Sequence, residues 1–278
     1  MRWYGIDFSG NHRMWRQNTG RSNVWIATIE STTGELRLME LIQVQELPAT
    51  DGMHPFDRLI TLLQRQDFTG AAIDAPFSLP KQFMERFGSH QGLLTKMRNI
   101  EYPSTRPFPD GVSFVKAVIG QNPPLEPPKP LRETERNCAP GINVRSTLWT
   151  GARPGAPMTA ACLTLLAKTG VPIWPWSSHT KTGLLVEAFP AAQLVRWEMS
   201  ANGYNGNTSE AREARDVIIK HLATRIFLPS ALHELMRCSA DALDAVLCGF
   251  AAIAVTKGIV AIPPTSVSID EGWIAVHP

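Results

Sequence analysis

The sequence predicts one α/β domain over residues 1–278, with helices flanking a mixed β-sheet. The chain has 278 residues, of which 44% are hydrophobic and 19% charged, and this is enough for one sizeable core. Short strand-like runs open the chain, and segments of helical periodicity occur between and after them. Two neighbouring runs near the amino terminus alternate in polarity across a turn, so part of the sheet is expected to be antiparallel.

Three strands open the predicted fold. Residues 3–8 form a short apolar run that contains Asp7 and is followed by a Ser-Gly-Asn turn, which indicates a buried first strand. Residues 24–29 and residues 35–44 alternate on either side of a Thr-Gly turn. We therefore expect a hairpin after the first strand, giving three antiparallel strands.

A helix and two further strands follow. Apolar residues recur at helical spacing over residues 56–63, and residues 71–73 form a small strand that runs into Asp74. Residues 184–186 are fully apolar, end at Glu187 and are soon followed by a proline, so they predict a fifth strand. Three of the predicted strands therefore end in a carboxylate.

A long basic and proline-rich insertion, residues 81–183, separates the fourth predicted strand from the fifth. Residues 103–130 contain eight prolines, which argue against a regular helix or central strand, so we expect an extended surface excursion there. Helical periodicity returns over residues 158–169. Residues 81–153 carry eleven Lys and Arg against six Asp and Glu, whereas the whole chain has a net charge of only +2. This local excess suits contact with a phosphate backbone, although a solvated surface would look the same.

The carboxy-terminal part predicts two helices and a closing strand. Residues 209–227 start with Ser-Glu-Ala and run to a proline, and residues 239–257 start with Ser-Ala-Asp and stop at a glycine. The second helix is apolar on nearly every face, so it should be buried against the sheet. Residues 273–276 predict the closing strand.

Composition narrows the kinds of site and compartment that we expect. The four cysteines form no Cys-X-X-Cys pair and the seven histidines have no metal-ligand spacing, so neither a zinc site nor a disulfide framework is indicated. No apolar run is long enough to span a bilayer, and the amino terminus lacks a signal-peptide pattern. We expect a cytoplasmic protein without membrane association, and the sequence does not predict its oligomeric state.

Five carboxylates form the candidate catalytic and metal site. Asp7, Asp74 and Glu187 stand at strand ends, and ligands usually bind where such ends meet at one edge of an α/β sheet. Asp241 and Asp244 are three residues apart and share a face of the last predicted helix. An unpaired ionised carboxylate in an apolar setting costs several kcal/mol. Several carboxylates in one place therefore predict a bound cation.

All-oxygen ligands select hard ions, so the predicted cofactor is Mg²⁺ or Mn²⁺, as one ion or two. Two such ions about 3.5–4 Å apart could activate a water and stabilise the leaving oxygen of a phosphodiester. Taken singly, Asp7 and Asp74 can also cap turns. Likewise, Asp241 can complement the helix dipole and Asp244 can face solvent. Glu187 has no turn residue beside it, and the joint pattern favours the metal site.

The order of four motifs resembles a known family. The motifs are Gly5-Ile6-Asp7-Phe8-Ser9-Gly10, Ile73-Asp74-Ala75-Pro76, Val186-Glu187-Ala188-Phe189-Pro190 and Ser239-Ala240-Asp241-Ala242-Leu243-Asp244-Ala245. They are similar to the signatures of the predicted ribonuclease H-like nucleases grouped as the domain of unknown function number four-two-nine, and residues 271–274 resemble that family's final strand. The resemblance spans nearly the whole chain. It implies a ribonuclease H-like sheet and a nuclease activity at the five acids, an activity that is itself a prediction for the family.

The insertion between the fourth and fifth strands is not matched motif by motif in this resemblance. Its candidate phosphate-binding cations are Lys129, Arg132, Arg136 and Arg145. The alternative for them is a solvated loop with local ion pairs.

Three functions remain open from the sequence. The first is a divalent-metal-dependent phosphodiesterase whose partner is DNA or RNA, the polymer type being unspecified. The second is a phosphotransferase or ATPase of the actin and sugar-kinase type, which also opens with an acid on the first strand. That candidate is weakened because Ser9 stands where a glycine is expected after Asp7, and no second glycine-rich phosphate loop follows Asp74. The third is a non-catalytic binding protein that keeps the ribonuclease H-like fold.

Overall fold

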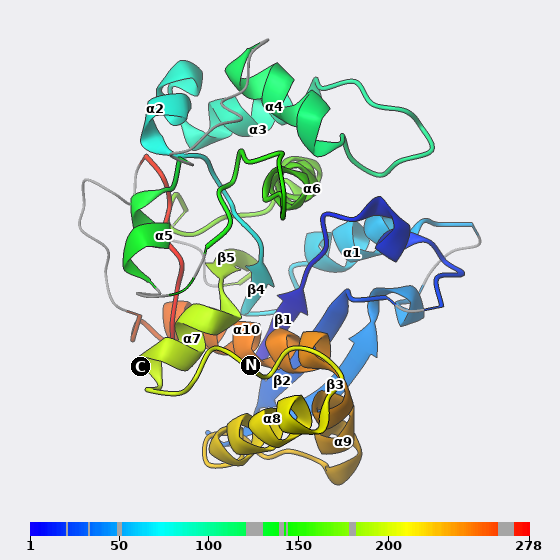
Figure 1. The fold of residues 1–278 in the computed structure, drawn as a ribbon, viewed down its shortest axis with the longest axis vertical. Coiled ribbons are helices and arrows are strands. Elements are labelled where there is room, and N and C mark those ends of the chain that lie inside the picture. The colour runs from blue at the N-terminus through cyan, green and yellow to red at the C-terminus, as the bar shows by residue number, and fades with distance from the viewer. Residues whose placement is uncertain are drawn as a thin grey trace.

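A five-stranded mixed sheet lies between two groups of helices in the computed structural model (Figure 1). The structure describes residues 1–20, 22–32, 34–48, 52–120, 130–138, 142, 144–177, 182–260 and 270–278. The strands are β1 (Arg2–Asp7), β2 (Trp25–Ser31), β3 (Leu36–Gln43), β4 (Gly70–Asp74) and β5 (Leu184–Ala188). The helices are α1 (Pro55–Gln64), α2 (Lys81–Met84), α3 (His90–Arg98), α4 (Gly111–Ile119), α5 (Glu133–Asn137), α6 (Ala156–Thr169), α7 (Pro190–Arg196), α8 (Ser209–Leu222), α9 (Ser230–Cys238) and α10 (Ala240–Thr256).

The strands run in the order β3-β2-β1-β4-β5 across the sheet. Strands β1, β2 and β3 are antiparallel neighbours, whereas β4 is parallel to β1 and β5 is parallel to β4. These pairings confirm the predicted mixed sheet and its antiparallel opening. Because β1, β4 and β5 are parallel, Asp7, Asp74 and Glu187 lie toward the same edge of the sheet.

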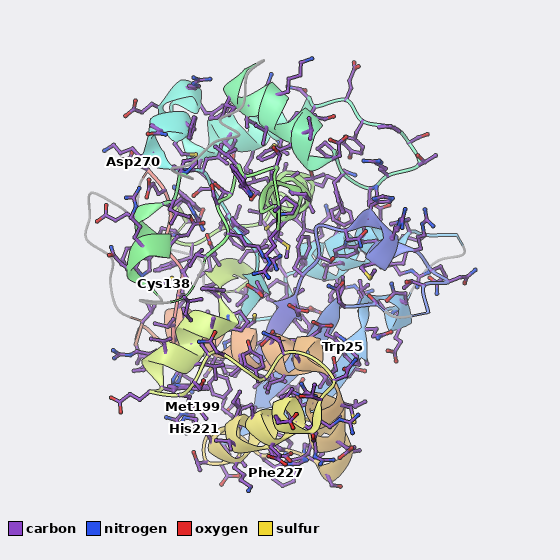
Figure 2. All side chains as sticks on the ribbon, viewed as in Figure 1. Trp25, Cys138, Met199, His221, Phe227 and Asp270 are labelled. Carbon is purple, nitrogen blue, oxygen red and sulfur yellow. The ribbon has the colours of Figure 1, made fainter. Side chains whose placement is uncertain are left out.

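Side chains of the strands alternate between two apolar cores, one on each face of the sheet. One core contains Ile6 and Ile73 together with residues of α1, α3, α4 and α6. The other contains Trp3 and Ala72 together with residues of α8 and α10. Figure 2 shows side chains filling the space between the sheet and both groups of helices. The face on which a strand residue points therefore decides which helices it meets.

Helix α10 lies across β1, β2, β4 and β5, as its apolar composition predicts. Glycines let its backbone touch that of β1, because a Cβ added at Gly5 would lie 2.0 Å from the carbonyl oxygen of Ala245. This contact sets the first turns of α10 beside the end of β1. Among the residues that the structure describes, no single helix is long and apolar enough to cross a membrane.

Within the predicted extended excursion, residues 103–130, the structure forms a helix. Helix α4 lies inside the stretch where prolines argued against a helix, and that prediction was wrong because the prolines flank residues 111–119 without entering them. The side chain of Asp110 caps the helix by accepting from the N–H groups of Val112 and Ser113 at 3.0 and 2.9 Å. Residues 121–129, which hold four of the eight prolines, lie outside the described residues.

The carboxy-terminal elements also differ from expectation. Within the described segment 270–278, no strand forms over residues 273–276, although the N–H of Ala275 donates to the carbonyl oxygen of Glu187 at 3.0 Å. Helix α7 begins at the proline that was expected only to stop β5, because proline suits the first turn of a helix. Helix α8 ends at Leu222, and Phe227 forms a bridge with Arg37 of β3 instead of extending the helix.

Candidate metal centre

Two of the predicted acids are the last residues of adjacent parallel strands. Asp7 ends β1 and Asp74 ends β4. Alternation puts them on the same face as Gly5 and Ala72, which contact α10 or share its core. Asp7 is 6% exposed and Asp74 is partly buried. Both carboxylates therefore lie on the face of the sheet that α10 covers.

Helix α10 supplies two more of the predicted acids. The hydroxyl of Ser239 caps the helix by accepting from the N–H of Ala242 at 3.2 Å, which places Asp241 in the first turn. Asp244 follows three residues later on the same face of the helix. Both acids are partly exposed, so the group of four aspartates is accessible to solvent.

The four aspartates interact electrostatically. Burial raises the pKa of Asp7 well above its usual value, and three neighbouring charges raise it further, those of Asp244, Asp74 and Asp241. Burial also raises the pKa of Asp74 to about 7, and the charges of Glu187 and, to a smaller extent, Asp241 raise it further. For Asp244, burial and then the charge of Asp74 raise the pKa in the same way. The structure thus brings four of the five predicted acids into one mutually repelling group, here called the aspartate cluster.

Two residues that the sequence did not single out support Asp244. The hydroxyl of Tyr204 donates to Oδ1 of Asp244 at 2.9 Å. The completely buried guanidinium of Arg215 donates to the carbonyl oxygens of Tyr204 at 2.5 Å and Gly206 at 2.9 Å, so it fixes the loop that carries the tyrosine. Two sequence signals could have identified these residues. Tyr204 is an aromatic residue in a loop rich in Asn and Gly, and Arg215 is an arginine on the buried face of a helix.

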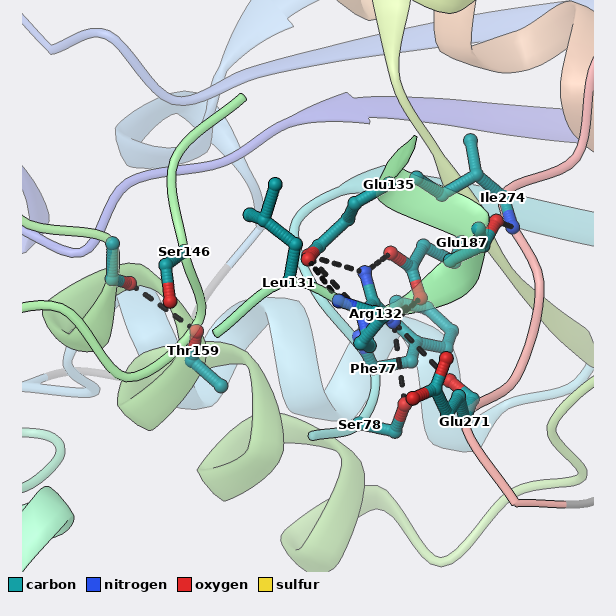
Figure 3. A network of polar contacts seen from close by, with 12 residues as sticks. Phe77, Ser78, Leu131, Arg132, Glu135, Ser146, Thr159, Glu187, Glu271 and Ile274 are labelled. Carbon is teal, nitrogen blue, oxygen red and sulfur yellow. Dashed lines mark hydrogen bonds and ion pairs between the residues drawn. The ribbon is translucent and has the colours of Figure 1, made fainter. Parts of the chain in front are cut away.

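Glu187 belongs to a different arrangement on the opposite face of the sheet. It precedes the last residue of β5. Its side chain therefore lies on the same face of the sheet as that of Leu185, and on the opposite face from that of Val186. There Nη1 of Arg132 donates to Oε2 of Glu187 at 2.8 Å and Nη2 donates to Oε1 (Figure 3). The N–H of Phe77 also donates to Oε2, at 3.0 Å. Both oxygens of Glu187 are therefore occupied by donors from the protein.

Arg132 connects four segments of the chain. Its Nε and Nη2 each lie 3.0 Å from Oε1 of Glu135 in α5, and its Nη1 donates to the hydroxyl of Ser78 at 3.2 Å. That hydroxyl in turn donates to the carbonyl oxygen of Glu271, near the carboxy terminus. Arg132 is only 1% exposed. In this arrangement it stabilises the loop after Asp74 and is not accessible to a substrate phosphate.

The remaining predicted phosphate contacts have different surroundings. Arg145 is exposed, and its positive charge opposes the rise in the pKa of Asp74, so it lies close to the aspartate cluster. Arg136 is exposed and donates to the carbonyl oxygen of Leu131 at 2.7 Å. Lys129 lies outside the described residues. Of the predicted cations that the structure describes, Arg145 has the best placement for a substrate held at the cluster.

The donor chemistry of the aspartate cluster suits a hard divalent cation, since every candidate ligand is a carboxylate oxygen. Among the described residues, however, no three carboxylate, imidazole or thiol groups converge closely enough to hold an ion as they stand. The side chains would have to rotate toward one another to bind it. Partial exposure of Asp74, Asp241 and Asp244 leaves room for such rotation.

The chain was compared with known protein families, curated proteins and solved structures. No curated protein and no solved structure matches the chain. The family model described as Protein of unknown function (DUF429) matches residues 5–268, a range that contains the aspartate cluster and Glu187. This match confirms the family resemblance that the four motifs indicated. Because it covers well over half of the sequence, the chain belongs to the family Protein of unknown function (DUF429).

Proposed function

We propose that this protein is a divalent-metal-dependent nuclease that hydrolyses phosphodiester bonds of DNA or RNA at the aspartate cluster. The observation that supports the proposal is the grouping of four partly or fully buried aspartates, whose charges raise the pKa values of Asp7 and Asp244. Such a group is unfavourable in the protein alone, and a divalent cation would relieve the repulsion. The mixed sheet with its antiparallel opening is consistent with the ribonuclease H-like fold that the family resemblance implies, and we include that fold in the proposal.

The residues of the cluster divide into ligands and supporting groups. Asp7, Asp74, Asp241 and Asp244 would hold Mg²⁺ or Mn²⁺, which prefer oxygen ligands. When bound, the ion would supply Lewis-acid stabilisation of the negative charge that develops on the phosphodiester oxygens. Glu187 is not among the proposed ligands, because Arg132 and the N–H of Phe77 occupy its oxygens.

Three other groups of this chain would then position the reacting parts. Tyr204 orients Asp244 through its hydrogen bond, and a residue that fixes a ligand in this way acts on metal affinity. Arg145 is exposed beside Asp74 and would contact a substrate phosphate. The pair of Arg132 and Glu187 fixes the loop after Asp74 from the other face of the sheet.

Cleavage assays test the proposal directly. Labelled single-stranded, duplex, hybrid and branched nucleic acids are incubated with the protein and Mg²⁺, Mn²⁺ or EDTA. We expect cleavage only with a divalent ion, and a loss on the order of 100-fold or more in Asp7→Asn. The matched control is Asp67→Asn, which changes an exposed aspartate after α1 and should cleave like the wild type. Cleavage by Asp7→Asn at the wild-type rate would contradict the assignment.

Thermal denaturation tests the metal separately from the chemistry. Mn²⁺ should raise the melting temperature of the wild type, because a ligand that binds only the folded state stabilises it. The increase should be small or absent in Asp7→Asn and should persist in Asp67→Asn. A wild-type melting temperature that ignores both ions would contradict the metal site. Calorimetric binding of a nucleotide without cleavage of any polymer would instead favour the phosphotransferase alternative.

A further inference from the structure

A short basic helix follows the strand that carries Asp7. The 3₁₀ helix η1 (His12–Trp15) begins five residues after Asp7, and Arg13 and Arg16 are exposed on it and just after it. Within the described ranges, neither arginine forms an ion pair with a carboxylate. Two available positive charges therefore stand close in sequence to an acid of the cluster.

Buried contacts fix η1 relative to Asp7. Trp15 is completely buried, and its Nε1 donates to the carbonyl oxygen of Ser9, two residues after Asp7, at 2.9 Å. The side-chain nitrogen of Gln45 donates to two backbone carbonyl oxygens of this segment at 2.7 and 3.2 Å. The short helix is thus fixed both by the buried ring of Trp15 and by hydrogen bonds to its backbone. Its arginines project from a support that needs little ordering when a ligand binds.

The same aromatic contacts bring a third arginine to η1. The ring of Phe108 packs on that of Trp15 with centroids 6.5 Å apart, and Arg106 precedes Phe108 by two residues. Partial burial lowers the pKa of His12, and the positive charges of Arg106 and of both η1 arginines lower it further. Two segments that are far apart in sequence therefore present their cations at one place on the surface.

The beginning of α6 contacts both the segment that carries Arg13 and Arg16 and the segment that carries Arg145. The surface formed by Arg13, Arg16 and Arg106 is here called the basic surface. A Cβ added at Gly10 would lie 2.4 Å from a backbone nitrogen of α6, so the helix starts directly against the turn after Asp7. A Cβ added at Gly155, just before α6, would lie 3.4 Å from the Cβ of Arg145. Arg145 in turn lies near Asp74. The basic surface and the aspartate cluster are therefore neighbours along one continuous stretch of packed backbone.

We propose that Arg13, Arg16 and Arg106 form a binding surface for the sugar-phosphate backbone of the nucleic acid whose cleavage we propose at the aspartate cluster. The inference rests on that proposed function for the identity of the polymer. Arginine suits this task, because its planar guanidinium can donate two parallel hydrogen bonds to a phosphate. Arg106 also pairs with Asp110 at 3.5 Å, and the two side chains are 35% and 43% exposed. Ion pairs as exposed as this contribute little to stability, so the pair leaves Arg106 available to a phosphate.

The proposal predicts how binding depends on sequence and salt. Contacts to phosphates fix the position of a strand without reading its bases, so affinity should vary little with sequence. Each phosphate contact adds about 0.9 to the slope of log Kd against log salt for duplex DNA and about 0.7 for a single strand. Removal of two contacts should therefore lower the slope by roughly 1.4 to 1.8.

Fluorescence anisotropy of labelled duplex and single-stranded oligonucleotides over a series of salt concentrations is the test. It uses the full chain with Asp7→Asn, so that cleavage does not interfere. In that background we compare no further change, Arg13→Gln/Arg16→Gln, and Arg106→Gln. The matched control is Arg65→Gln/Lys257→Gln, which removes two exposed charges near the other end of β1, where they face Tyr4 and Trp3. Melting temperatures show that each variant is folded.

The outcomes separate this proposal from the nuclease assignment. The Arg13/Arg16 variant should lose affinity at least tenfold with the expected fall in slope, Arg106→Gln should lose less, and the control should bind like its parent. An unchanged affinity and slope in the Arg13/Arg16 variant overturns the basic surface, even if the wild type cleaves. Loss of binding in that variant without cleavage by the wild type supports the surface and overturns the nuclease. Binding of neither oligonucleotide by the parent Asp7→Asn chain also overturns the surface as a nucleic-acid site.

Discussion

The Arg132 guanidinium donates from both terminal nitrogens to the two carboxylate oxygens of Glu187, and neither residue is more than 2% exposed. Buried charges are tolerated only when good geometry and further hydrogen bonds compensate for the loss of water. Here Glu135 and the N–H of Phe77 complete the arrangement. Because Phe77 lies in the loop after β4, the ion pair fixes the chain beyond Asp74 while lying on the other face of the sheet.

We expect Arg132→Met to destabilise the protein by about 3–5 kcal/mol, because Glu187 and Glu135 would be left buried without their cation. Unfolding in urea measures the loss. The matched control is Arg136→Met, which removes an exposed arginine of α5, the helix that Arg132 immediately precedes, and should change stability by less than about 0.5 kcal/mol. An equal, small effect of both substitutions would show that the buried pair does not stabilise the fold.

The position of Glu187 shows how far a strand-end pattern can predict a site. Apolar runs ending in acids correctly predicted β1, β4 and β5, and the Asp-X-X-Asp spacing correctly predicted a shared face of α10. The face of the sheet on which an acid points depends on a single residue of register. Asp7 and Asp74 end their strands, whereas Glu187 is followed by one more strand residue. Sequence patterns do not locate the end of a strand to within one residue, so they could not predict on which face Glu187 lies.

The partners of Glu187 were harder still to predict. Arg132 lies 55 residues earlier, in a segment without a recognisable motif, so nothing local in the sequence joins the two. Helix α4 was missed because the prolines around it outweighed the apolar periodicity of residues 111–119. In the structure its apolar side chains pack in the same core as those of α6. Such contacts between segments distant in sequence decide the structure of residues 81–183.

A second prediction concerns acid and His90. This residue is 5% exposed, its ring stacks on that of Trp176 with centroids 3.6 Å apart, and its Nε2 lies 2.7 Å from the carbonyl oxygen of Phe77. Burial lowers the pKa of His90 to about 4, whereas an unfolded histidine has a pKa of about 6.5. The unfolded chain therefore binds the proton more tightly. The contribution of neutral His90 to the free energy of unfolding is therefore complete above pH 6.5 and is lost as the pH falls toward 4. The free energy of unfolding should fall by roughly 2 kcal/mol from this cause between pH 7 and pH 5.

The variant His90→Gln isolates this effect, since glutamine can donate to the same carbonyl and does not titrate. The difference in unfolding free energy between wild type and variant should shrink by that amount from pH 7 to pH 5. Comparing the two chains cancels the opposite contribution of the aspartate cluster, whose raised pKa values favour the folded state in acid. His233→Gln, at a partly exposed histidine, is the control. A difference that is constant with pH would contradict the role of His90.

A third prediction concerns Tyr204. Tyr204→Phe removes only the hydroxyl that donates to Asp244, so the loop and its contacts with Arg215 should remain. If Asp244 is a metal ligand, loss of this hydrogen bond should weaken Mn²⁺ binding by about 10- to 100-fold. Titration calorimetry measures the affinity, and Tyr102→Phe, whose ring instead lies beneath Lys168, is the control. Equal Mn²⁺ affinity in wild type and Tyr204→Phe would remove the tyrosine from the site.

A fourth prediction follows from the close contact of β1 with α10. In Gly5→Ala the new methyl group would meet the backbone of Ala245 at 2.0 Å, and backbone cannot yield without moving the helix. In Gly249→Ala the obstacle is the flexible end of Ile29, 2.6 Å away, and at Gly20 nothing lies within 4 Å. We expect losses of stability in that order, at least about 1–3 kcal/mol for Gly5→Ala and less than about 0.5 kcal/mol for Gly20→Ala. Urea unfolding gives the order of the three losses.

Because α10 carries Asp241 and Asp244, Gly5→Ala should also weaken Mn²⁺ binding in the fraction that stays folded. A Gly5→Ala protein with wild-type stability and Mn²⁺ affinity would contradict the idea that this contact positions the cluster.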